Sequence, residues 1–229
     1  MKCDLRVLAP MAVCAASVPA LANMSLVDPG HEGVVVEQGT GAPIAGAKVI
    51  GKWTVGYSSL AHSGERCVKV LVVESDAAGN FRLPPWETQD TPVTVLDLFL
   101  YAYKPGYRFD KSPEPIVAHP GGFAGLTGVG TVKLSKGNVM RVQMARWDPE
   151  PAQRADYLLK FLPSIQCVFS SAEWGTIYFV SRGVYEEFAG FPPEVRRTSK
   201  RDFMPWLKEQ VDADRSKLQK ENPSWKETQ

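Results

Sequence analysis

Short apolar runs separated by turn-forming residues dominate the chain from Gly33 to Arg146. Valine, isoleucine, leucine and aromatic residues make up the runs, and glycine, proline, asparagine and aspartate fill the gaps, as expected for short strands joined by tight turns. Seven such strands predict an antiparallel β-sandwich. The predicted strands cover residues 33–37, 47–55, 67–75, 80–83, 93–104, 130–134 and 139–146. In the last of them Val139, Arg141 and Gln143 alternate with Met140, Val142 and Met144, and either face could be the buried one.

The pattern becomes helical near Trp147. Asp148 is a favourable N-cap with Pro149 at the first helical position. Apolar residues then recur at helical spacing, as Tyr157, Leu158, Phe161 and Leu162. A second helix is predicted over residues 172–188, with a break at Gly190, Phe191, Pro192 and Pro193.

A third helix, amphipathic and charged, is predicted from about Asp202 to Lys220. Together these patterns divide the chain into a β-sandwich over residues 23–147, a small helical region over 148–220 and a flexible tail over 221–229.

The first 22 residues have the form of a secretory signal peptide. Lys2 and Arg6 give a positive start, a mostly apolar run follows, and Ala20-Leu21-Ala22 provides a cleavage site before Asn23. Two alternatives remain: a buried first helix, and a lipoprotein anchored at Cys14, although Val13 stands where a small residue is usual. Cleavage between Ala22 and Asn23 predicts a periplasmic or extracellular protein, and no later segment is apolar enough to span a membrane.

Cleavage would leave two cysteines, Cys67 and Cys167, which are 100 residues apart. In an exported protein they are candidates for a single disulfide, and two buried free thiols are the alternative. Cleavage would also remove Lys2, Arg6 and Asp4, so that 26 − 2 = 24 basic residues balance 25 − 1 = 24 acidic ones. A net charge of zero argues against nucleic acid as a partner, because general nucleic-acid binders carry a basic excess.

Three motifs resemble the carboxypeptidase regulatory-like family. They are a strand followed by Thr40-Gly41-Ala42-Pro43-Ile44-Ala45-Gly46-Ala47, the hairpin Asp76-Ala77-Ala78-Gly79-Asn80-Phe81-Arg82-Leu83, and Lys104-Pro105-Gly106-Tyr107. The resemblance implies a prealbumin-like (transthyretin-like) sandwich and a role as an adaptor, because such domains are reused for many purposes. The stretch between the first two motifs is longer than in that family, which predicts an inserted loop over residues 56–66.

Candidate catalytic residues are few. His62 and Glu65 fit the H-x-x-E metal pair of zinc carboxypeptidases, with His119 as a third ligand, but zinc needs three or four ligands fixed by their neighbours, and we expect no metal and no cofactor. The serines at 58, 59, 170 and 171 lack a nucleophile-elbow setting. The glycine-rich stretch 119–130 lacks the Lys-Ser/Thr end of a phosphate loop. The Tyr-Arg-Gly-Ser ending of transthyretin-fold hydrolases is also missing.

Two surface patterns have both a binding and a structural interpretation. The basic residues from Arg196 to Arg201 could meet an anionic surface, but a solvated entry to a helix fits the neutral net charge better. Six aromatic residues could form a sugar-stacking face, although aromatic residues in strands usually belong to the core. These are Trp53, Tyr57, Trp86, Tyr101, Tyr103 and Tyr107.

The sequence therefore favours a non-enzymatic envelope protein, a β-sandwich interaction module with a helical appendage that docks on an unknown envelope protein or polysaccharide. A carbohydrate- or peptidoglycan-binding module and, less favoured, a metal-dependent hydrolase are the alternatives.

Overall fold

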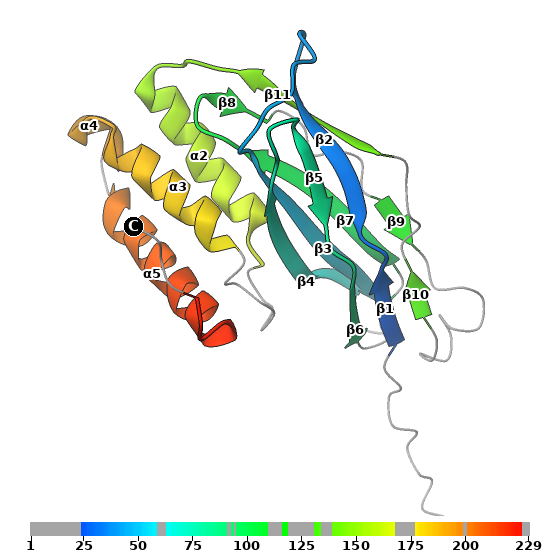
Figure 1. Ribbon diagram of the computed structural model, residues 1–229. Helices are drawn as coiled ribbons and strands as arrows, with labels where there is room; N and C mark the ends of the chain where they lie inside the picture. Colours follow the sequence, from blue (N-terminus) through cyan, green and yellow to red (C-terminus); the bar gives the residue numbers. More distant parts are fainter. Residues whose placement is uncertain are drawn as a thin grey trace, which may run out of the picture.

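The computed structural model describes residues 24–58, 63–90, 93, 95–109, 116–118, 131–133, 139–167, 177–198 and 201–225. The chain is mainly β, with helices gathered on one side (Figure 1). The strands up to the first described helix are β1 Met24–Asp28, β2 His31–Glu37, β3 Lys48–Ser58, β4 Ser63–Glu74, β5 Asn80–Leu83, β6 Trp86–Asp90, β7 Val95–Tyr103, β8 Tyr107–Arg108, β9 Ile116–Ala118, β10 Thr131–Lys133 and β11 Met140–Arg146. After them come α2 Pro151–Ile165, α3 Tyr178–Ala189, α4 Pro193–Arg196, β12 Arg197–Thr198, β13 Arg201–Asp202 and α5 Phe203–Glu221.

The strands form two four-stranded sheets, of order β5-β2-β11-β8 and β4-β3-β7-β9, with a three-stranded sheet of order β10-β1-β6 beside them. Inward-facing apolar side chains from all three sheets form one core, which includes Leu26, Val35, Trp53, Leu83, Leu98 and Met144. In β11 the buried face carries Val142 and Met144, while Arg141 and Gln143 face solvent. This shared core supports the predicted β-sandwich.

All seven predicted strands overlap an observed strand, but the count of seven is not confirmed. β1, β6, β8 and β9 are additional, as are the short strands β12 and β13, which form a two-stranded sheet of their own. The predicted loop over residues 56–66 is wrong in the part that the structure describes, because the β3–β4 ladder continues through Val55↔Arg66 to Ser58↔Ser63. The extra residues lengthen a hairpin instead of forming a separate loop.

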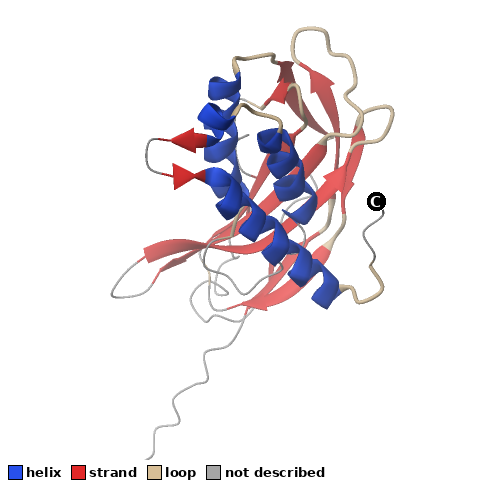
Figure 2. Cartoon of the chain, turned by 90° about the vertical axis from the view of Figure 1, so that its left-hand side faces the viewer, coloured by secondary structure: helices blue, strands red, loops and turns tan. Residues whose placement is uncertain are grey.

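The helices form a third layer on the β4-β3-β7-β9 sheet, which Figure 2 shows behind them. Alternation along a strand sends successive side chains to opposite faces, so this sheet has two apolar faces. Its outer face supplies Ile50, Val70 and Tyr103, and the helices cover it with a second core that includes Leu158, Phe161, Leu162, Ile165, Val180, Val184, Phe188 and Leu207. The apolar faces of the helices are therefore mostly used inside the molecule, although Phe179 on α3 is 44% exposed.

The helix limits differ in detail from the prediction. α2 begins at Pro151 after Glu150, so the predicted N-cap Asp148 and first-turn Pro149 are wrong by two residues, because the chain stays non-helical until the next proline. Of the predicted second helix, residues 172–176 lie outside the described part, and α3 ends before Gly190 as expected. α5 begins after Asp202, whose side chain accepts a hydrogen bond from the Met204 N–H at 3.0 Å.

A buried carboxylate, that of Asp28 at the end of β1, holds the first described strand in place through hydrogen bonds. Asp28 is 1% exposed and accepts three hydrogen bonds, from the Gly30 N–H at 2.6 Å, the Trp53 indole at 2.5 Å and, at 3.0 Å, from His31 Nε2. A buried carboxylate without such partners would be costly. Asp28 thus connects β1, the following turn and β3.

Candidate functional site

Most of the candidate metal and catalytic residues lie outside the described part of the chain. His62 and His119 are among them, as are Ser59, Ser170 and Ser171. Glu65 is on β4 and exposed. Within the described ranges, no three histidine, cysteine, aspartate or glutamate side chains come close enough to hold a metal ion.

The six aromatic residues do not form an exposed row in the described structure. Trp53 and Tyr103 are buried, Trp86 packs edge-on against Trp53 with ring centroids 5.5 Å apart, and Tyr101 and Tyr107 are half-buried. The side chain of Tyr57 lies outside the described set. These positions agree with the core interpretation of the aromatic pattern.

The prediction that the basic cluster from Arg196 to Arg201 leads directly into a helix is wrong. Arg196 ends the short helix α4, and the chain then forms the β12–β13 hairpin before α5. Arg197 faces Asp202 across this hairpin, with Nε 3.6 Å from the carboxylate. Cross-strand pairing of opposite charges accounts for the difference from the sequence prediction.

The structure joins Cys67 and Cys167 in a disulfide, with Cα atoms 5.3 Å apart, in agreement with the predicted pair. The bond connects β4 to the segment that follows α2. Nearby, Lys52 Nζ donates to the Ser164 carbonyl oxygen at 2.8 Å, and burial lowers the pKa of this lysine. Both contacts hold the end of α2 against the sheet.

A buried ion pair holds the other end of α2, and sequence reasoning missed it. Arg154 is buried, and its guanidinium donates to both carboxylate oxygens of Glu187 on α3, at 2.5 and 3.1 Å. The same guanidinium donates to the Tyr107 carbonyl at 2.6 Å, and the Tyr103 hydroxyl donates to Glu187 at 3.0 Å. Burial, with the Glu187 charge, raises the pKa of Tyr103. This network fixes α2 and α3 to the sandwich.

A second buried polar pair lies between α3 and α5. The Ser181 hydroxyl donates to Asp214 Oδ2 at 2.7 Å, and both residues are at most 2% exposed. Burial raises the pKa of Asp214 to about 6. The pair lies buried between the two helices and contributes to their packing.

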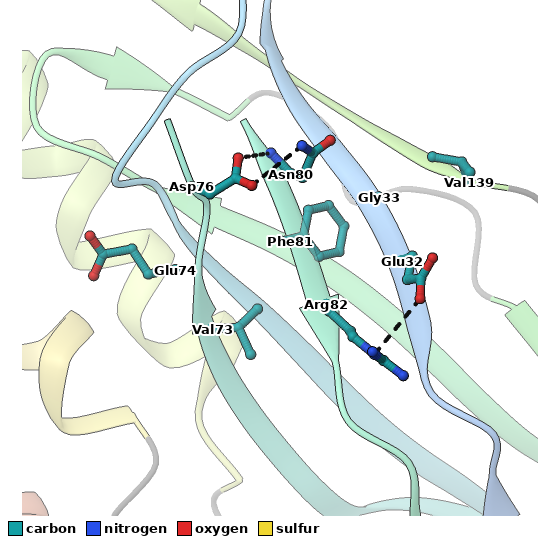
Figure 3. Close-up of a pocket in the computed structure, with 9 residues that line it drawn as sticks. All are labelled: Glu32, Gly33, Val73, Glu74, Asp76, Asn80, Phe81, Arg82 and Val139. Carbon is teal, nitrogen blue, oxygen red and sulfur yellow. Dashed lines mark hydrogen bonds and ion pairs between the residues drawn. The ribbon is translucent and has the colours of Figure 1, made fainter. Parts of the chain in front are cut away.

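The surface feature best suited to binding is an open hollow of about 500 Å³ at one edge of the sandwich, here called the edge hollow (Figure 3). It lies where β4 and β5, the end strands of the two four-stranded sheets, follow each other through the turn at Asp76. Val139, on its rim, is 71% exposed, the most exposed large apolar residue in the described part of the chain. The lining consists of Glu32, Gly33, Val73, Glu74, Asp76, Asn80, Phe81, Arg82 and Val139.

Three carboxylates and one guanidinium surround this hollow. Asp76 accepts hydrogen bonds from the N–H groups of Ala78 and Asn80, at 2.9 and 2.8 Å, and the Asn80 bond is the main cause that lowers its pKa. Arg82 Nε lies 3.7 Å from Glu32, and Lys48 on β3 is ion-paired with Glu74, so two of the three carboxylates have a cation beside them. Asp76 is therefore the one lining carboxylate without a cation beside it, and the base of the hollow is apolar.

No protein-family model and no curated protein match this sequence. Among solved structures, a streptococcal ancillary pilin is 16% identical with a TM-score of 0.28; the match covers 56% of this chain, which spans about a third (31%) of that pilin's length. The C-terminal domain of a shaft pilin from Lactobacillus rhamnosus GG is 13% identical, with a TM-score of 0.24 over 55% of this chain and 99% of that domain.

A lipoxygenase from Cyanothece PCC8801 is 11% identical, with a TM-score of 0.19 over 99% of this chain and 27% of the other. At these scores and identities the likenesses establish neither a shared fold nor a shared function. The described helices include none that is long and apolar enough to cross a membrane.

Proposed function

We propose that this protein is an exported, non-enzymatic interaction module of the cell envelope, which binds a protein partner at the edge hollow. One observation carries the proposal: two sheets end side by side, at β4 and β5, around an open hollow with an apolar base and an exposed valine on its rim. Binding surfaces commonly combine an apolar centre with a polar rim.

The helical layer supports this placement of the binding surface. The helices bury their apolar faces on the sheet, and their solvent sides carry ion pairs between residues four apart, such as Arg182–Glu186 and Lys208–Asp212. A surface of this kind has little to gain from desolvation. In this proposal the helices brace the sandwich, and the sandwich edge makes the contact.

The proposal also includes export through the predicted signal peptide and membership of the carboxypeptidase regulatory-like family. The predicted signal peptide delivers the chain to an oxidising compartment, where the Cys67–Cys167 disulfide is stable. The carboxypeptidase regulatory-like resemblance fits a module of this kind, in which the sandwich serves as a scaffold for contacts.

Site-specific photo-crosslinking in the native host tests the proposal. A photoreactive amino acid replaces Val139 on the hollow rim or, as a matched control, the exposed Glu209 on the outer side of α5. We expect a discrete crosslinked species of defined mass from position 139 and none from position 209. Equal crosslinking at both positions, or none at either, would contradict the proposal.

A further inference from the structure

We infer that α5 is a pH-sensitive helix: it packs on α3 in acid and detaches more often as the pH rises toward neutral, while the rest of the molecule stays folded. The inference is independent of binding at the edge hollow. It rests on how α3, which lies between α2 and α5 (Figure 1), is held on its two sides. The contact with α2 contains a complete buried ion pair, whereas the contact with α5 contains a buried carboxylate opposite a hydroxyl.

α5 is attached along one narrow stripe. The buried side chains described on it are Leu207, Val211 and Asp214, at spacings of four and three residues, which place them on one face of the helix. An apolar residue would suit the third position of such a stripe. Asp214 stands there instead and meets Ser181 of α3, with its carboxylate oxygen 2.7 Å from the hydroxyl. The contact between α3 and α5 therefore has a titratable group at its centre.

α2 and α3 are held more firmly. The Cys67–Cys167 disulfide ties the segment after α2 to β4. The Arg154 guanidinium, which is buried, donates to both carboxylate oxygens of Glu187, so the negative charge on that side of α3 is matched by a cation. Breaking either link would cost several kcal/mol. These two helices are expected to stay in place when α5 moves.

The other described contacts of α5 are uncharged. Gln166 at the end of α2 donates to Gln210 at 3.0 Å. Beyond the end of α5, the ring of Trp225 packs edge-on against Tyr178 of α3, with centroids 5.5 Å apart. Elements held by few buried contacts open locally at a lower free-energy cost than the whole domain. α5 is therefore the element of the helical layer best suited to detach alone.

The groups that face Asp214 do not neutralise it. α3 presents the Ser181 hydroxyl, and Tyr178 and Tyr185, about one helical turn before and after Ser181, are uncharged below about pH 10. Lys217 on α5 itself attracts the carboxylate, but burial outweighs both this attraction and the Ser181 hydrogen bond. The pKa of Asp214 is raised to about 6 as a result.

Two guanidinium groups adjoin the pair in sequence but contact other partners. Arg182 follows Ser181, and its Nε lies 2.6 Å from Glu186. Arg215 follows Asp214, and its guanidinium lies over the Tyr178 ring at 5.9 Å from the centroid. Consecutive residues of a helix point about 100° apart, which accounts for this divergence.

Ionisation of Asp214 in the closed contact would leave a charge away from water, and local opening of α5 hydrates it. In the open form the carboxyl has its ordinary pKa of 3.8, and in the closed form a pKa of about 6. The contact is therefore most stable below the lower value and weakens as the pH rises through the higher one. Linkage between these two values predicts that the opening equilibrium increases roughly fiftyfold from pH 4 to pH 7.

Hydrogen exchange followed by mass spectrometry at pH 4 and pH 7 tests this inference on the whole protein. Rates are expressed as protection factors, so that the intrinsic pH dependence of amide exchange divides out. We expect the protection of residues 207–218 in α5 to fall roughly fiftyfold between the two pH values, while that of α2 changes little.

Two variants separate Asp214 from other titrating groups. Asp214→Asn cannot ionise and keeps an acceptor for Ser181, so its α5 protection should not depend on pH. The matched control is Asp212→Asn, on the same helix, where the carboxylate is half-exposed and pairs with Lys208 at 2.6 Å. This control should keep the wild-type pH dependence. Equal protection of α2 in all three proteins at pH 4 shows that the fold is preserved.

Three results would overturn the inference. One is a loss of protection in α5 and α2 together, because opening would then be global. The second is equal protection of α5 at pH 4 and pH 7. The third is a wild-type pH dependence in Asp214→Asn. The first two need no variant, and none of the three bears on the Val139 crosslink that tests the proposed function.

Discussion

Replacement of Asp214 by asparagine should change how stability depends on pH. Asp214 is 2% exposed between α3 and α5, and burial raises its pKa to about 6 from an ordinary value of 3.8. The folded state therefore binds this proton more tightly than the unfolded chain. The stabilising contribution is fully present below the unfolded pKa and is lost as pH rises through about 6.

The magnitude follows from the shift. A difference of about two pKa units corresponds to about 3 kcal/mol, and about 2 kcal/mol of it falls between about pH 4 and pH 8. An asparagine in place of Asp214 cannot titrate, yet its side-chain carbonyl can still accept the hydrogen bond that Ser181 donates to Asp214 at 2.7 Å. Relative to the wild type, Asp214→Asn should therefore gain about 2 kcal/mol of unfolding free energy over this pH range.

Urea unfolding of both proteins across that range measures the effect, because titration of all other groups cancels in the difference. Ser181→Ala is a directional control: the Ser181 hydrogen bond lowers the pKa of Asp214, so its loss should raise that pKa further and steepen the pH dependence. Parallel stability curves for wild type and Asp214→Asn would refute the reasoning, because Asp214 would then be solvated in the folded state.

Three further predictions follow from the same structure. Thiol titration of the denatured, unreduced mature protein should find no free thiol, and reduction of the Cys67–Cys167 bond should cost roughly 2–5 kcal/mol; two reactive thiols per chain would exclude the bond. Arg154→Met should cost about 3 kcal/mol, because Glu187 would remain part-buried without its cation; an unchanged urea midpoint would show that the ion pair does not fix the helices. N-terminal sequencing of the native protein should begin at Asn23, and a blocked, lipid-modified start at Cys14 would contradict that cleavage site.

The β region was largely predictable because its strands carry their own apolar pattern and turn residues. β1 and β6 could not be predicted, because the sequence of each lacks the apolar pattern of a strand. In β1 the inward position of Asp28 is polar, and its partners His31 and Trp53 become apparent only in the fold. β6 is mostly polar and follows two prolines, so only its pairing with β1 identifies it as a strand.

The candidate site was less predictable than the fold. Glu74 and Asp76 are two residues apart in the sequence, but Glu32 comes from β2, and only the fold places it at the same hollow. The Arg154–Glu187 pair is separated by 33 residues and by a helix packing angle that no local pattern specifies. The disulfide could be proposed because compartment and cysteine count limit the choices.

The buried carboxylate of Asp28 also bears on how β1 is aligned. β1 has five residues, and its side chains alternate, so a shift by one residue would exchange its two faces. Such a slip would place Val27 beside the Trp53 indole and leave both the indole and His31 without the carboxylate. An apolar residue at position 28 would make the two alignments more nearly equal in free energy. Asp28 therefore contributes selectivity between alternative pairings of the terminal strand, a benefit that a measurement of overall stability would miss.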